Sequence, residues 1–139
     1  MMGGFIIIMS KIQIDERLED YIKKETIDIL EELKINRSFK GYRFLITTTI
    51  IIYKANRANE YINAKEIYAK TASKHRTSRS KVERDIRYIH ESYLKELQKY
   101  FDFNMKVTTK QLMLTLAHAV EKRIESKTVY QGTAEIVKS

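Results

Sequence analysis

The chain has no cysteine, no proline and no tryptophan, and only four of its 139 residues are glycine. The absence of cysteine excludes both disulfides and thiolate metal sites. The scarcity of proline and glycine removes the residues that most often interrupt helices, while Ile, Leu, Lys and Glu are abundant. We therefore expect an all-α fold with short connections, of a length that suits one domain with a real core.

Motifs of catalysis and of cofactor binding are also missing. The histidines His75, His90 and His118 are far apart, and Leu94 stands where a zinc-protease motif beginning at His90-Glu91 would need its second histidine. No glycine-rich phosphate loop and no serine nucleophile elbow occurs. A carboxylate pair brought together only by folding is left open. We expect no enzyme, no metal, no cofactor and no small-molecule ligand.

Charge and hydropathy indicate the kind of partner. Lys and Arg total 26 against 18 Asp and Glu, a formal charge of +8, which favours a polyanion without choosing among DNA, RNA and an acidic membrane. The apolar run Phe5 to Met9 is too short to span a bilayer, and residues 1 to 10 lack the features of a secretory signal. We expect a cytoplasmic protein without a membrane partner. The run either packs on the domain, which we favour, or serves self-association.

The stretch from Asn63 to Phe101 has the pattern of two helices joined by a tight turn. Asn63 and Glu66 have capping-box spacing, which predicts a helix from there to about Lys74. We expect Thr77 to cap a second helix that extends to Phe101. Residues at four- and three-residue steps form an apolar stripe along this second helix: Val82, Ile86, Ile89, Tyr93 and Leu97.

The opposite side of the second helix is polar and largely basic. It carries Ser80, Glu83, Arg84, Arg87 and Glu91, and residues 70 to 87 hold seven Lys or Arg against two acids, a local balance of +5. A helix-turn-helix that reads DNA needs this division, with one side packed and long hydrogen-bond donors on the other. The alternative is an ordinary solvated face, which also mixes charges of both signs.

The segment Ser80-Lys81-Val82-Glu83-Arg84-Asp85-Ile86-Arg87 resembles the recognition helix of a known family, the C-terminal effector domain of stage 0 sporulation protein A. That family's pattern is Ser-Arg-Val-Glu-Arg-x-Ile-Arg, and the resemblance spans about residues 26 to 126. It also covers upstream positions: Lys40-Gly41-Tyr42, Leu45, Tyr53, Lys65 and Tyr68. The resemblance implies a single bundle of about six helices that contains a helix-turn-helix, binds a promoter element in the major groove and regulates transcription.

The resemblance and the polar pattern together nominate seven DNA-binding residues: Thr77, Ser80, Lys81, Glu83, Arg84, Arg87 and Tyr88. We expect Arg87 to read a guanine, with Glu83 holding its guanidinium or accepting from a cytosine amino group. Lys81 and Arg84 would anchor phosphates. Lys81 replaces the family's Arg and Tyr88 its His, which leaves general DNA affinity intact but puts the family's target sequence in question.

We therefore expect a sequence-specific double-stranded DNA-binding protein, a transcriptional regulator related to sporulation control. The alternatives are a helical protein–protein adaptor and a nonspecific nucleic-acid binder. Residues 1–25 would form an N-terminal extension, 26–126 the effector-like domain and 127–139 a frayed tail. With about 25 residues before the match, the sequence suggests an effector without a receiver domain, self-associating weakly or only on DNA.

The remaining segments give further expectations. Residues 14 to 33 have the spacing of one amphipathic helix, or two, with Tyr21 near its apolar side. The β-branched run from Thr47 to Ile52 has strand propensity, but we predict a buried helix because no second strand is present to pair with it. The aromatic residues at 100 to 103 are expected in the core, and Thr108 with Gln111 should cap a last helix.

The sequence also departs from the family upstream of the recognition helix. Lys34 and Asn36 stand where the family is expected to carry Gly and Pro, and Ala69 stands in place of a Pro. We expect the local turn geometry to differ there.

Overall fold

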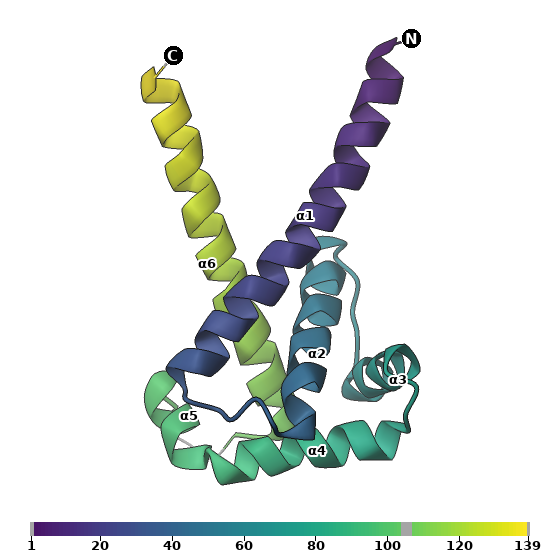
Figure 1. Cartoon of the computed structure of the whole chain (residues 1–139), viewed down its shortest axis with the longest axis vertical. Helices are drawn as coiled ribbons and strands as arrows, with labels where there is room; N and C mark the ends of the chain where they lie inside the picture. The colour runs from purple at the N-terminus through teal and green to yellow at the C-terminus, as the bar shows by residue number, and fades with distance from the viewer. Residues whose placement is uncertain (1, 104–106, 139) are drawn as a thin grey trace.

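The computed structural model describes residues 2–103 and 107–138, with side chains described for 16–103 and 107–127. These residues form six helices joined by short connections, and no strand occurs among them (Figure 1). They are α1 (Met2–Glu32), α2 (Lys40–Arg57), α3 (Ala64–Lys74), α4 (Arg79–Ser92), α5 (Leu94–Tyr100) and α6 (Thr109–Lys138). The predicted all-α bundle of about six helices is confirmed.

Helix α2 is the central element, in contact with α1, α3, α4 and α6. Its β-branched run is helical, as predicted, and nearly all of it is buried. The three threonine hydroxyls are satisfied within the helix: Thr47 donates to the Arg43 carbonyl at 3.2 Å, and Thr48 and Thr49 donate to the Leu45 carbonyl at 3.0 and 2.7 Å. Burial with full hydrogen bonding offsets the low helix propensity of this run.

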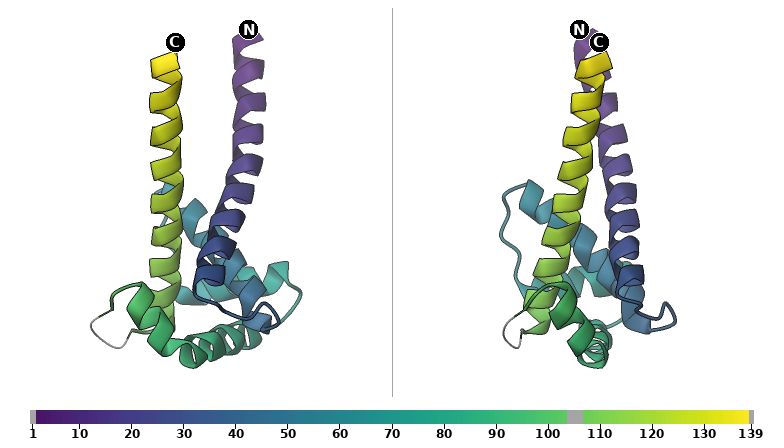
Figure 2. Two further views of the ribbon diagram at one scale, coloured as in Figure 1. Left: turned by 60° about the vertical axis from the view of Figure 1, so that its left-hand side comes forward. Right: turned by 90° about the vertical axis from the view of Figure 1, so that its left-hand side faces the viewer.

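Helices α1 and α6 pack on α2 and run toward the end of the molecule at which both termini lie (Figures 1 and 2). α1 is one continuous helix, and the expectation that Tyr21 lies near its apolar side is wrong, since this ring is 51% exposed. Polar contacts join the two helices: Lys127 pairs with the buried Glu25, and Arg123 pairs with Glu32 at 2.7 Å. The Arg123 hydrogen bond lowers the pKa of Glu32.

The aromatic segment at the end of α5, residues 100 to 103, is only partly in the core. Phe101 packs against the core, with Tyr100 and Phe103 at ring distances of 4.9 and 5.7 Å. Tyr100 itself is exposed, which corrects the core expectation for this residue. Its hydroxyl instead donates to Glu32 and accepts from Arg123 at 2.8 Å, so it belongs to the α1–α6 contact.

The start of helix α6 agrees with expectation, whereas its end does not. The predicted capping box is confirmed: the Gln111 N–H donates to Thr108 Oγ1 at 3.1 Å, and the Thr108 N–H donates to Gln111 Oε1 at 2.8 Å. The frayed tail is not observed, because α6 continues to Lys138. No proline interrupts residues 127 to 138, and the single Gly132 costs a helix only about 1 kcal/mol. Side chains beyond 127 and those of the run Phe5 to Met9 lie outside the described residues.

Four helix ends share one C-terminal turn, although none has a glycine. Each turn has one residue with a positive φ, between 54° and 59°: Lys34 after α1, Asn59 after α2, Arg76 after α3 and Asp102 after α5. In each case the next N–H bonds a carbonyl five residues back, as in Ile35 to Leu30 at 3.1 Å. This is the Schellman arrangement, in which glycine normally holds the left-handed position.

We expect Lys34→Gly to raise the free energy of unfolding by about 0.5–1 kcal/mol. A left-handed residue with a Cβ costs about 1–2 kcal/mol, and glycine removes this cost while adding some unfolded-state entropy. Urea denaturation measures the difference, with Lys34→Ala as control because it keeps the Cβ. Equal stability of the Gly and Ala variants would contradict the expectation.

Candidate nucleic-acid interface

The helix-turn-helix is formed by α3, a turn at residues 75–78, and α4. Asn63 caps α3 as predicted, accepting from the Glu66 N–H at 2.8 Å. The cap of α4 is Ser78, which accepts from the Lys81 N–H at 3.2 Å, so the assignment of this role to Thr77 is wrong by one residue. The Schellman turn after α3 extends through Thr77, whose N–H bonds the Ala72 carbonyl at 3.0 Å. Thr77 therefore belongs to the end of α3.

His75 fixes this turn to α2. Its Nε2 lies 2.7 Å from Thr47 Oγ1, and its ring meets Phe44 edge-on with centroids 5.0 Å apart. Burial lowers the pKa of His75, and the positive charges of Arg43 and Lys74 lower it further. The neutral ring is thus the form that the folded turn favours. Burial also lowers the pKa of His90, whose Nδ1 lies 3.0 Å from Thr109 Oγ1.

Stability should fall as pH is lowered from 6.5 toward 5. Since the folded pKa values of His75 and His90 lie below the unfolded value, the unfolded chain binds more protons in this range, and stability decreases with acid. Each histidine contributes at most about 1.4 kcal/mol per pH unit. Urea titrations at pH 7.5, 6.5 and 5.5 measure the effect, and His75→Gln should reduce it. Unchanged stability over this range would contradict the prediction.

The inner side of α4 is locked into the core. Val82, Ile86 and Ile89 are fully buried. Gly41 of α2 approaches α4 so closely that a Cβ on it would lie 2.8 Å from the Asp85 carbonyl carbon and 2.9 Å from Ile89 Cδ1. The position of α4 is therefore set by backbone contact with α2 as well as by side-chain packing.

The predicted continuous helix to Phe101 is wrong, because the chain breaks at Tyr93 into α4 and α5. The hydroxyl of Tyr93 accepts from the Asn36 N–H at 3.1 Å, and its ring packs edge-on against Phe39 at 5.9 Å. These tertiary contacts hold Tyr93 in a non-helical conformation, and Leu97 of α5 is buried beyond the break.

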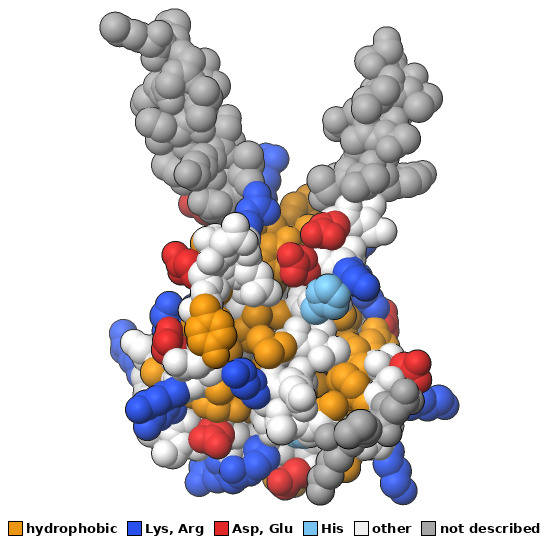
Figure 3. Space-filling model, turned by 180° about the vertical axis from the view of Figure 1, so that it is seen from behind, with side chains coloured by type: hydrophobic (Ala, Val, Ile, Leu, Met, Phe, Trp, Pro, Cys, Tyr) orange, Lys and Arg blue, Asp and Glu red, His pale blue; other side chains and the backbone are white. Residues whose placement is uncertain are grey.

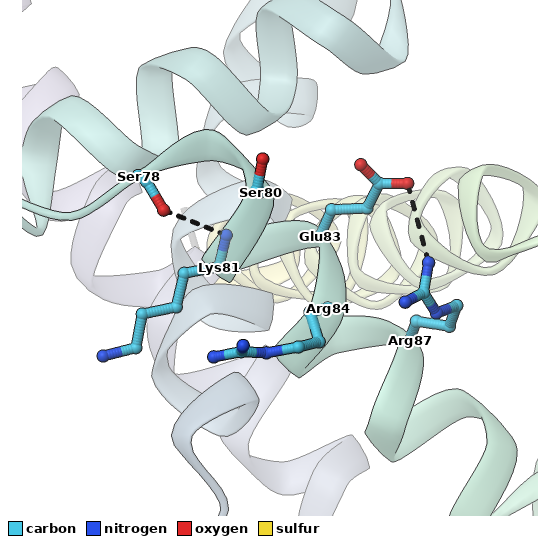
Figure 4. A pocket seen from close by; sticks show the side chains of 6 residues that line it. All are labelled: Ser78, Ser80, Lys81, Glu83, Arg84 and Arg87. Carbon is cyan, nitrogen blue, oxygen red and sulfur yellow. Dashed lines mark hydrogen bonds and ion pairs between the residues drawn. The ribbon is translucent and has the colours of Figure 1, made fainter.

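The outer side of α4 brings most of the predicted residues together. A hollow of about 480 Å³ is lined by Ser78, Ser80, Lys81, Glu83, Arg84 and Arg87 (Figure 4). Lys81 and Arg84 extend side by side along one flank of α4, while Glu83 and Arg87 face each other on the other flank. Ser78 was missed by sequence reasoning, although a Ser one residue after Thr77 is an equally good cap.

The charged groups in the hollow are only loosely paired. Arg87 lies 3.9 Å from Glu83 and 3.9 Å from Glu91, and its side chain is half exposed. Arg84 lies 3.6 Å from its neighbour Asp85. The exposed pairs of Arg87 are worth a few tenths of a kcal/mol at most, so its guanidinium is available to an incoming anion. The Asp85 side chain is mostly buried, but the Arg84 side chain is 65% exposed and can also be reached by an anion.

Two predicted residues lie outside the hollow. Thr77 is half-buried in the turn. Tyr88 is 57% exposed on α4, and its ring meets Phe39 edge-on at 5.5 Å. Tyr88 therefore stands at the junction between α4 and the start of α2.

Basic side chains gather around this interface. Viewed from behind, Lys and Arg crowd the lower left edge of the molecule, the end at which the α3–α4 turn lies (Figures 1 and 3). Within the described residues, no three His, Asp or Glu side chains are placed to share a metal ion. None of the helices, in the part of the chain described, has the length and apolar character required to cross a membrane.

Comparison with known proteins identifies the family. The family model described as "Sporulation initiation factor Spo0A C terminal" matches residues 26–124, most of the chain. No match is found among curated proteins or among solved structures. The matched range contains the whole helix-turn-helix and the hollow on α4, in a family of DNA-binding effector domains rather than of enzymes. The chain belongs to the family of Spo0A C-terminal domains, the DNA-binding effector domains of sporulation initiation.

Proposed function

We propose that this protein is a sequence-specific double-stranded DNA-binding protein that acts in the cytoplasm, without enzymatic activity, as a transcriptional regulator in sporulation control. One observation carries the proposal: within the range that the family model matches, the outer side of α4 holds Ser80, Glu83, Arg84 and Arg87 on an exposed surface. Since the inner side of α4 is fully buried, this surface is pre-organised, as a recognition helix in the major groove must be.

The two flanks of α4 would have different roles in the complex. Arg87 presents a planar fork suited to the O6 and N7 acceptors of guanine, with Glu83 beside it to orient the fork or to accept from a cytosine amino group. Lys81 and Arg84 on the other flank would contact phosphates. Ser80 and Thr77 would add hydroxyl contacts at the helix start, and Tyr88 would contact the duplex at the edge of the interface.

Nonspecific binding by charge is the main competing function, because the formal charge of +8 would attract any duplex. A helical adaptor for protein partners is the other. Selection from random duplexes, followed by sequencing, separates these functions. We expect enrichment of one short motif, and a preference for it over its scrambled version that persists as salt rises. Equal loss of affinity on both duplexes would indicate nonspecific binding, and no binding would favour the adaptor.

Self-association is proposed to be weak, or to depend on DNA. Sedimentation of the free protein should show mainly monomer, with two copies assembling on duplexes that carry two adjacent sites. Deletion of residues 1 to 10 tests whether the apolar run Phe5 to Met9 contributes. A tight dimer without DNA at low concentration would overturn this proposal, and loss of that dimer on deletion would identify the run as its interface.

A further inference from the structure

The first turn of α2 lies against the flank of α4 that carries the phosphate-binding candidates. Gly41 abuts the backbone of Asp85, and Phe39 packs on Tyr88. Lys81, Asp85 and Tyr88 repeat at four- and three-residue spacing, so they share this flank of α4. The start of α2 therefore borders the DNA-facing surface on the side of Lys81, opposite the Arg87 side.

Two cations project from this part of α2. One face of α2 carries residues at three- and four-residue spacing, namely Lys40, Arg43, Phe44 and Thr47. Phe44 and Thr47 contact His75, so this face of α2 is directed toward the α3–α4 turn. Lys40 and Arg43 are exposed, and neither has an ion-pair partner in the part of the chain that the structure describes. The proximity of Arg43 to the turn is also seen in its electrostatic effect on His75.

We propose that Lys40 and Arg43 form a second phosphate-binding element, which holds the DNA backbone beside the groove that α4 enters. This inference rests on the proposed DNA-binding function and extends it to a helix outside the helix-turn-helix. Because the start of α2 packs on the flank of α4 that carries Lys81, its cations Lys40 and Arg43 would add to the positive charge that Lys81 and Arg84 offer to the phosphates of a DNA strand. The contacts carry no sequence information, so they set register and affinity rather than base preference.

The salt dependence of binding measures these contacts. Each neutralised phosphate contributes about 0.9 to the slope of log K against log salt, so the double variant Lys40→Ala/Arg43→Ala should flatten the slope by about 1.8 on both selected and scrambled duplexes. The selected motif should remain preferred by the same ratio. Arg43→Lys should keep the slope, because the charge is conserved.

The matched control is Lys23→Ala/Lys24→Ala, which removes two exposed cations from α1, a helix that packs on α2 and α6. This control should change the slope little. Thermal unfolding of both double variants confirms that the fold is intact, since the Arg43 guanidinium also lies over the Phe44 ring at 5.5 Å. Single neutral methylphosphonates in the selected duplex then locate the contact. At the phosphates held by α2 they should weaken the wild type and leave the Lys40→Ala/Arg43→Ala protein unaffected, whereas at phosphates held by Lys81 or Arg84 they should weaken both proteins.

Three results would overturn the inference. An unchanged slope in the Lys40→Ala/Arg43→Ala protein, with the wild type still preferring its motif, would refute this contact while leaving the proposed function standing. An equal flattening of the salt slope in the Lys23→Ala/Lys24→Ala control would show that the total charge of the protein, and not a contact by α2, sets the salt dependence. Absence of wild-type binding to any duplex would refute the proposed function itself, and this inference with it.

Discussion

Gly41→Ala is expected to lower the free energy of unfolding by about 1–3 kcal/mol, the cost of overpacking a tight site. The added Cβ would lie 2.8 Å from the Asp85 carbonyl carbon and 2.9 Å from Ile89 Cδ1, and the Asp85 contact is with backbone that cannot rotate away. Relief requires α4 to move away from α2. Affinity for both selected and scrambled duplexes should fall with stability, because the recognition surface shifts relative to the rest of the domain.

The sign of the change in stability caused by Gly41→Ala shows whether close packing or helix propensity dominates at this position. Replacing glycine by alanine inside a helix normally stabilises it by about 0.5–1 kcal/mol. The exposed Ala69 of α3 offers a control, since Ala69→Gly should show the ordinary helix preference for alanine. Chemical denaturation compares the two variants. A stabilising effect of Gly41→Ala would contradict the close approach of α2 and α4.

Arg87→Ala should cost about 1–3 kcal/mol on the selected duplex and little on a scrambled one, the loss expected when a bidentate contact to guanine is removed. Its exposed pairs with Glu83 and Glu91, both at 3.9 Å, predict only a few tenths of a kcal/mol in stability. Fluorescence-anisotropy titrations on both duplexes measure the affinities, and denaturation measures the stability.

Lys81→Ala is the matched comparison from the same helix. Lys81→Ala should weaken binding equally on both duplexes, because a phosphate contact is independent of sequence. The slope of log K against log salt should flatten by about 0.9. If Arg87→Ala also weakened both duplexes equally, the base-reading role of Arg87 would be refuted. The remaining basic surface would then account for binding by charge alone.

The sequence predicted the features that depend on local patterns. The apolar stripe at Val82, Ile86 and Ile89 is buried, and the capping residues Asn63 and Thr108 are in place, because helical periodicity and capping act over a few residues. The helical state of the Thr47 to Ile52 run required a fold-level argument, since its propensity favours a strand. Its helix is stable because burial and threonine hydrogen bonds act together.

Features set by tertiary contact could not be predicted in the same way. No residue type marks the break at Tyr93, which depends on Asn36 and Phe39 from the α1–α2 connection. The Schellman ends were hidden because their left-handed positions hold residues such as Lys34 and Arg76 in place of glycine. The position of the basic start of α2 beside α4 could not be predicted either, because it depends on the packing of Gly41 on Asp85.

Methylation interference on the selected duplex tests most directly whether the outer side of α4 reads bases. Methylation of guanine N7 blocks an acceptor in the major groove. We predict that methylating one guanine of the motif weakens wild-type binding at least as much as Arg87→Ala does, and that Arg87→Ala binds the methylated and unmethylated duplexes equally. If no major-groove methylation affected wild-type binding, or if the sensitive guanine were the same for Arg87→Ala, the assignment of α4 as the base-reading helix through Arg87 would be contradicted.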